Sequence, residues 1–237
     1  PSLRLNTMII DCHGHVSPPP TLWVYKANLL SHRGAHGRRM PEITDEEILA
    51  SANKKEMAPK GHLDMMDAFG IDLQMLSPRP FQMMHSAKPA KLVHWFIEET
   101  NNIIARTAQL IPNRFVPVAG LPQAAGEPVE NCLPELERCV QMGFRGALLN
   151  PDPFENTGTE APPLGDRYWY PLYEKLCELD VPMHIHATGS HSPRSPYTLH
   201  FINEESIAVY GLARLFSAAP AHGGLAARMS GAPLIIH

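Results

Sequence analysis

Two histidines separated by one residue close a short apolar run near the start of the chain, in IIDCHGHV over residues 9–16. Alternate side chains of an extended strand point to the same face, so His13 and His15 share one side, and Gly14 keeps the backbone between them uncrowded. Imidazole nitrogens are frequent metal ligands. An isolated pair of this kind is more often bonded by backbone and water, so it supplies only half of a metal site.

A second pair, His184 and His186, stands in VPMHIHATG over residues 181–189. If both segments are strands of one sheet, at least a third imidazole faces His13 and His15. Three nitrogen ligands with one open position are typical of a catalytic zinc site rather than a structural one. The two pairs together therefore predict a catalytic divalent metal.

Strand-like and helix-like segments alternate along the chain without a break in composition, which predicts a parallel sheet with helical crossovers. A closed barrel and an open doubly wound sheet both satisfy this pattern. Polar residues follow at least five of the strands, which favours the rim of a (β/α)8 TIM-type barrel, present here as about six strand-helix units. No glycine-rich phosphate loop follows the first strand, so nucleotide binding is disfavoured. The predicted strands are MIIDCHGH, DLQMLSPRP, FVPVAGLP, FRGALLNPDP, VPMHIHATG and APLIIH.

Helical periodicity is clearest over residues 90–111, where Pro112 ends the pattern. One or two helices are predicted over residues 43–71, with Thr44 as the N-cap and Glu47 as its capping-box partner. Further helices are predicted over residues 129–143, 168–180 and 202–217. The segment 21–39 is mixed and basic, with SHRGAHGRR as a mobile loop.

The composition indicates one large soluble domain, with 237 residues, 44% apolar content and a formal charge of −4. That net negative charge does not favour binding to nucleic acid or to an anionic membrane. No apolar stretch approaches a membrane span, and the N-terminus lacks a secretory signal, so we expect a cytoplasmic protein. The four cysteines are interpreted as reduced core residues because they show no disulfide-scaffold spacing.

Arg79, at the end of the second predicted strand, is the first candidate for binding a substrate carboxylate, because a guanidinium matches that group bidentately. The alternative is an ordinary surface ion pair. Arg194 and His85 are further candidates, and Asn150 could donate to the substrate. Asp152, between two prolines, is expected to shape its own loop. The triplet 168–170 is expected to serve packing.

From Met8 to about Leu212 the chain resembles the amidohydrolase superfamily, in the branch that contains aminocarboxymuconate semialdehyde decarboxylase and 4-oxalomesaconate hydratase. The motifs that carry the resemblance, in order, are IIDCHGH, SPRP, LPQ, ELERCV, GFRGALLNPDP, DRYWYPLYEKL and VPMHIHATGS. The SPR, LNPDP and DRYWYPLYEK elements look most like 4-oxalomesaconate hydratases.

The resemblance implies that His13, His15 and His186 hold one divalent ion, zinc or another metal, and that His184 packs behind them. It implies a hydratase that adds water to an unsaturated keto di- or tricarboxylic acid such as 4-oxalomesaconate, in the protocatechuate 4,5-cleavage pathway. A metal-dependent non-oxidative decarboxylase, an inactive remnant and a hydrolase of amides or lactones stay open as alternatives. Arg79, His186 and His237 are the expected catalytic residues.

The family pattern continues beyond a sixth strand, with a histidine followed by glycines and later an acidic group. His237 is chosen as the strand-six histidine because it follows the strand-like PLIIH, whereas His222 follows SAAPA. The domain is therefore interpreted as residues 8–237, truncated after strand six, with residues 1–7 as a leader or tag remnant before Met8. Open sheet edges predict a homo-oligomer and weak activity.

Overall fold

The computed structural model describes residues 8–55, 60–79, 82–154, 157, 159, 161–162 and 164–186, together with the backbone of residues 234–236. The strands are β1 (Ile10–His15), β2 (Leu73–Ser77), β3 (Phe115–Pro117), β4 (Ala119–Gly120), β5 (Ala147–Leu149), β6 (Met183–Ile185) and β7 (Leu234–Ile236). The helices are α1 (Pro20–His32), α2 (Asp45–Ala52), α3 (His62–Phe69), α4 (Lys91–Leu110), α5 (Leu133–Gln141) and α6 (Tyr170–Glu178), with 3-10 turns η2 (Val129–Cys132) and η3 (Arg167–Trp169).

All strand pairs are parallel, and neighbouring strands follow the order of the chain. The order is β1-β2-β3 in one sheet and β4-β5-β6-β7 in the other. Only Val118 separates β3 from β4. The amide of Val118 donates to Leu76 O at 2.9 Å, and the amide of Ala119 donates to Gly146 O at 2.8 Å. The two sheets are therefore continuous at this point. This order is typical of a TIM-barrel-like fold, because a doubly wound sheet reverses its strand order.

The predicted strand FVPVAGLP is thus two short strands, and the other five predicted strands each contain an observed one. The chain pairs with β2 up to Pro117 and with β5 from Ala119 onward. The strand ends of β1, β2, β5 and β6 consequently lie at one edge of the sheet, as expected for the carboxyl ends of parallel strands.

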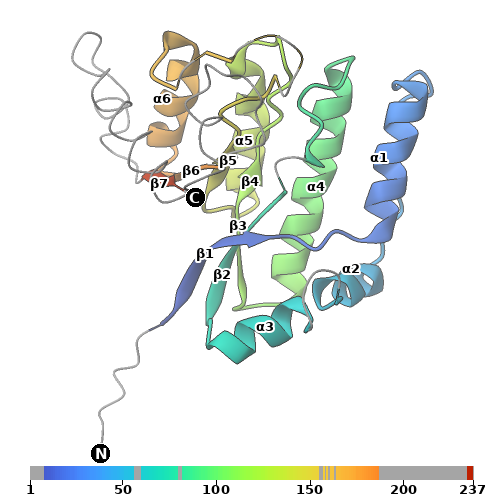
Figure 1. The fold of residues 1–237 in the computed structure, drawn as a ribbon, viewed down its shortest axis with the longest axis vertical. Helices are drawn as coiled ribbons and strands as arrows, with labels where there is room; N and C mark the ends of the chain where they lie inside the picture. Colours follow the sequence, from blue (N-terminus) through green and yellow to red (C-terminus); the bar gives the residue numbers. More distant parts are fainter. Residues whose placement is uncertain are drawn as a thin grey trace, which may run out of the picture.

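Four helices, α1, α4, α5 and α6, stand side by side along the strands (Figure 1). The helix predicted from the apolar periodicity of residues 90–111 is confirmed as α4, which ends before Pro112. Phe96, Ile97 and Ile103 are among its buried residues. Helix α1 was not predicted, because its region was interpreted as a mixed basic segment after a run of prolines. Pro20 occupies the first turn of this helix, where its missing N–H costs nothing. Leu22, Tyr25 and Leu29 then bury one face of α1.

Two helices, α2 and α3, occupy the region predicted to hold one or two. The hydroxyl of Thr44 accepts from Glu47 N at 3.2 Å, so the predicted N-cap is confirmed. The carboxylate of Glu47 instead accepts from the amide of Thr21 at 2.9 Å. The second half of the predicted capping box therefore joins α2 to the start of α1.

The core divides into clusters between the sheet and its helices. Trp169 and Tyr170 are buried in the cluster that includes β5 and β6, and Tyr168 is partly buried against it, which confirms the packing role expected for the aromatic triplet. All four cysteines are free thiols, but only Cys132 and Cys139 are buried. Cys12 is exposed on β1, so its interpretation as a core residue is wrong: it lies on an uncovered face of the strand.

The predicted helix over residues 202–217 lies outside the described residues, as do Arg194, His222 and His237. None of the helices in the described part of the chain is both long enough and apolar enough to cross a membrane.

Candidate metal centre

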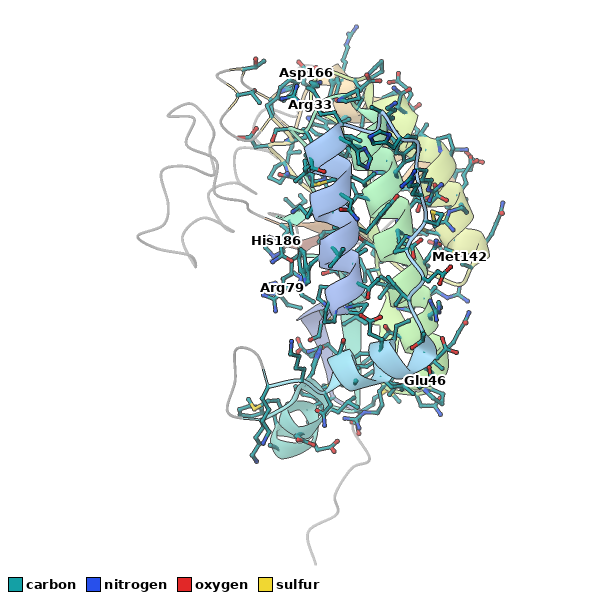
Figure 2. All side chains as sticks on the ribbon, turned by 90° about the vertical axis from the view of Figure 1, so that its right-hand side faces the viewer. Arg33, Glu46, Arg79, Met142, Asp166 and His186 are labelled. Atoms are coloured by element: carbon teal, nitrogen blue, oxygen red, sulfur yellow. The ribbon has the colours of Figure 1, made fainter. Side chains whose placement is uncertain are left out.

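The carboxyl ends of β1 and β6 bring three histidines to one point. His13 and His15 lie on β1, and His186 directly follows β6. The backbone amide of His186 donates to Leu149 O at 3.0 Å, which continues the pairing of β6 with β5 by one residue. Figure 2 shows His186 close to Arg79 on one side of the molecule, away from Met142 at the end of α5.

The three Nε2 atoms form a nearly equilateral triangle. They are 3.1 Å apart between His13 and His15, and 3.2 Å apart from His186 to either of the others. Tetrahedral zinc bound at 2.0–2.1 Å requires ligand nitrogens about 3.3 Å apart. Among the described residues these three also form the one group of metal-ligand side chains close enough to share an ion. The donor set and its spacing therefore fit a divalent metal.

A hydrogen-bond network fixes which nitrogen of His15 faces this point. Ser77 Oγ donates to Gly14 O at 3.0 Å, so its lone pair is left to accept from His15 Nδ1 at 2.9 Å. Pro78 O, 3.1 Å from the same nitrogen, can only accept. His15 Nδ1 therefore carries the proton, and Nε2 presents a lone pair to the centre of the triangle, as metal-binding histidines require.

Electrostatics keep His15 neutral. Burial is the largest cause that lowers the pKa of His15, to about 3. The neighbouring His186, His13 and Arg79 act in the same direction. Metal ions bind the unprotonated form of imidazole, so an environment that disfavours protonation of His15 leaves its Nε2 available to a metal ion.

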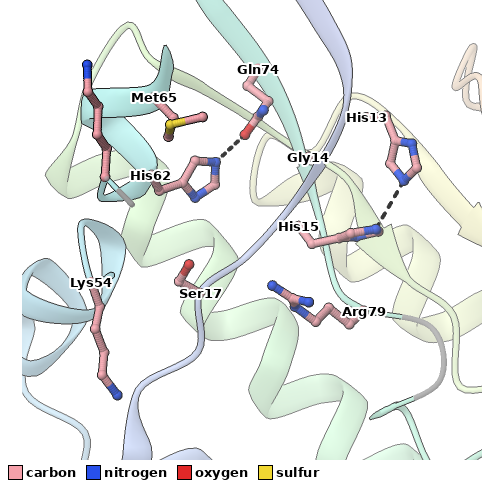
Figure 3. Close-up of a pocket in the computed structure, with 10 residues that line it drawn as sticks. His13, Gly14, His15, Ser17, Lys54, His62, Met65, Gln74 and Arg79 are labelled. Atoms are coloured by element: carbon pink, nitrogen blue, oxygen red, sulfur yellow. Dashed lines mark hydrogen bonds between the residues drawn. The ribbon is translucent and has the colours of Figure 1, made fainter. Parts of the chain in front are cut away.

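Gly14 has a structural reason to lie between the two histidines. A Cβ at this position would lie 2.2 Å from Gln74 Cδ. The amide of Gln74 lies over Gly14 here. Its Nε2 donates to Asp11 Oδ2 at 2.5 Å, and its Oε1 bonds to His62 Nε2 (Figure 3). Asp11 Oδ1 in turn accepts from the amide of His13 at 2.9 Å. With Gln74 in this position, a side chain at position 14 would displace the Gln74 amide and its hydrogen bonds.

A pocket of about 250 Å³ borders the histidines. Among the described residues, its lining contains three basic side chains, Arg79, Lys54 and Lys60, and no carboxylate. Figure 3 shows Arg79 beside His15, with Lys54 farther along the pocket. Such a lining favours an anionic ligand with more than one negative group.

The structure brings the expected Arg79 to the histidines, and it adds the two lysines that sequence reasoning missed. Both belong to ANKKEMAPKGH, the connection between α2 and α3. Lysines in a connection between helices usually face solvent, so the sequence alone carried no signal for them.

The remaining candidates lie elsewhere. His85 and Asn150 are fully buried and bond to each other, with 2.7 Å between His85 Nδ1 and Asn150 Nδ2, and neither lines the described pocket. Asp152 Oδ1 accepts from Phe154 N, so the expected loop-shaping bond is present. His184 is 1% exposed within β6, in agreement with the packing position expected for it.

The amidohydrolase family model matches residues 10–228. The chain belongs to this family. It is 38% identical over 207 residues to the 2-keto-4-carboxy-3-hexenedioate hydratase of Sphingobium sp. (strain NBRC 103272 / SYK-6), an alignment that covers 85% of this chain and 58% of the relative. The solved structure of 4-oxalomesaconate hydratase, LigJ, from Rhodopseudomonas palustris is similar with a TM-score of 0.65 and 35% identity, over 78% of this chain and 53% of that one.

Decarboxylases are also similar to this amidohydrolase. The gamma-resorcylate decarboxylase of Rhizobium radiobacter is 31% identical over 136 residues, which cover 56% of this chain and 38% of the relative. A dihydroxybenzoic acid decarboxylase from Polaromonas sp. JS666, solved with bound manganese, shares the fold with a TM-score of 0.52 and 24% identity, over 76% of this chain and 49% of that one. The chain spans little more than half the length of the two hydratases.

Proposed function

We propose that this amidohydrolase is a metal-dependent hydratase acting on an unsaturated keto-carboxylic acid such as 4-oxalomesaconate, in the protocatechuate 4,5-cleavage pathway. One observation carries the proposal: a triangle of imidazole nitrogens borders a pocket whose lining, in the part of the chain that the structure describes, holds three basic side chains and no carboxylate. The similarity to two hydratases of unsaturated keto acids supports it. We further propose that the protein is a cytoplasmic (β/α)8 barrel that forms homo-oligomers.

Zinc is the proposed ion, held by His13, His15 and His186, because three imidazoles with an open position are typical of catalytic zinc. Manganese is the alternative, since a decarboxylase with the same fold contains it. When bound, such an ion acts as a Lewis acid and lowers the pKa of water from about 15.7 toward 7.

The chain's own residues bind and orient the acid. The guanidinium of Arg79 pairs with a carboxylate bidentately beside the histidines. Lys54 and Lys60 then neutralise a second carboxylate farther along the pocket, so that the reacting carbons are held at the metal end. His237 and Arg194 lie outside the described residues, and we still propose that His237 contributes to catalysis and Arg194 to substrate binding. Asn150 and His85 are buried, so any contribution of theirs to the site is indirect.

A decarboxylase of the same family is the second candidate, favoured by the 31% identity to gamma-resorcylate decarboxylase. It would use the same ion and Arg79 to hold a carboxylated ring. An inactive metal-binding remnant is the third possibility, which turnover separates from both.

The test measures product and metal together. Purified protein is assayed by elemental analysis, and candidate acids are followed by loss of the conjugated chromophore and by carbon dioxide release. We expect one divalent ion per chain and chromophore loss without gas. Gas release would assign the decarboxylase, whereas bound metal with no turnover of any acid would assign the remnant.

The Arg79→Ala variant sharpens the assignment. It should retain the metal and weaken substrate binding about 10- to 100-fold, the scale of a lost charged hydrogen bond. Arg106→Ala is the matched control, because Arg106 pairs with Asp45 on the surface. Equal affinity in the two variants would contradict a substrate role for Arg79.

A further inference from the structure

Gln123 replaces a missing strand partner at the end of β5. The ladder between β4 and β5 pairs Ala119 with Ala147 and Gly120 with Leu148. Beyond it, Gln123 Oε1 accepts from the amide of Asn150 at 2.8 Å, and Gln123 Nε2 donates to Asn150 O at 2.8 Å. One buried side-chain amide thus satisfies both backbone groups of Asn150, where unpaired groups would be costly.

The side chain of Asn150 extends this arrangement to His85. Asn150 Oδ1 accepts from the amide of Asp152 at 2.9 Å, so its Nδ2 is the atom that faces His85 Nδ1 at 2.7 Å. Burial lowers the pKa of His85 to about 4, opposed by a hydrogen bond to the backbone of Leu121.

His85 therefore connects the ends of two neighbouring strands. It contacts Asn150 after β5 and the backbone of Leu121 after β4, and its own carbonyl accepts from Ala125 N at 2.8 Å. All three side chains of the cluster are at most 4% exposed. The residue before Asn150 is Leu149, whose carbonyl accepts from the amide of His186.

We propose that His85, Gln123 and Asn150 form a positioning clasp that fixes the carboxyl end of β5 and, through Leu149, the place of His186 in the metal centre. The effect of the clasp on metal binding rests on the proposed metal-dependent function. In this proposal His85 and Asn150 position the site and do not contact the substrate. These residues act through His186 and do not touch the ion.

The test compares Gln123→Met, which keeps the volume of the side chain and removes both hydrogen bonds to Asn150, with Thr107→Val. The control removes a buried hydroxyl that bonds only within α4, to Ile103 O. Hydrogen exchange of the His186 amide is measured in the metal-free proteins. We expect it to be about tenfold faster in Gln123→Met and unchanged in Thr107→Val.

Cobalt(II) binding supplies the second readout, through affinity and the visible spectrum of the ion. Gln123→Met should bind about 10- to 100-fold more weakly with an altered spectrum, the scale of losing support behind a ligand. Gln123→Asn keeps a side-chain amide, and His85→Gln keeps a hydrogen-bonding side chain. Both variants should therefore bind cobalt(II) more tightly than Gln123→Met does.

The outcomes separate the clasp from the metal assignment. Unchanged exchange at His186 in Gln123→Met, with the same loss of thermal stability as Thr107→Val, would overturn the clasp. Absence of cobalt binding in the unaltered protein would instead overturn the proposed function, while the exchange measurement would still decide whether the clasp holds His186.

Discussion

At the scale of single residues, the candidate site depends on the orientation of imidazole rings. His15 shows how it is achieved: Ser77 and Pro78 supply acceptors for Nδ1, and this leaves Nε2 for a ligand. The orientation comes from β2, because Ser77 at the end of that strand lies 62 residues after His15 in the chain. The histidine alone therefore does not determine its own tautomer.

Ser77→Ala tests this support. Losing one of two acceptors should weaken binding of zinc about tenfold, because groups behind a metal ligand typically contribute 10- to 100-fold. Titration of the metal-free protein against a competing chelator measures the change. Ser31→Ala, which removes a hydroxyl bonded within α1, is the control, and equal affinity in both variants would contradict the assignment.

At the scale of elements, β1 and β2 meet at position 14 of β1, where the Gln74 side chain of β2 occupies the space that a Cβ would need. The register shifts between Asp11 and Gly14, so the strand is irregular where the histidines begin. Gln74 fills the space above Gly14, and both atoms of its amide group are bonded, Nε2 to Asp11 and Oε1 to His62. This packing explains why a residue without a side chain separates the two histidines.

Gly14→Ala should therefore destabilise the protein by about 1–3 kcal/mol, the cost of overpacking a closely packed site. Urea unfolding measures the change, with Gly165→Ala as control because a Cβ there would meet nothing within 4 Å. In a Gln74→Ala background the same substitution should cost much less. An equal cost in both backgrounds would show that Gln74 is not the obstacle.

At the scale of the whole molecule, the parallel strands follow one another in chain order, and within the described part of the chain β1 is paired on one side only, by β2. Ile9 and Ile10 are half exposed there, at 51% and 50%. An unpaired strand edge with apolar side chains is a template for association.

We therefore expect concentration-dependent self-association, measured by light scattering during size-exclusion chromatography. Ile10→Lys should weaken it about tenfold or more, because a charge on an edge strand opposes pairing. Val24→Lys, on the exposed face of α1, should leave it unchanged. A constant monomer mass at all concentrations would contradict the expectation.

Local patterns in the sequence determined much of this protein. The spacing of His13 and His15, the period of α4 and the N-cap at Thr44 each depend on residues a few positions apart, so their geometry follows from strand alternation and helical repeat. The motifs that resemble the amidohydrolase superfamily led to the family that the comparison then showed.

Only the tertiary structure decided which residues meet. The meeting of His186 with the N-terminal pair depends on the pairing of β6 with β5, and only the structure shows that Lys54 and Lys60 line the same pocket as Arg79. Likewise, only the structure shows that His85 and Asn150 are buried and lie 2.7 Å apart, which is the basis of the proposed clasp. These contacts join segments far apart in the chain, and packing of the whole sheet, which no local pattern encodes, sets their distances.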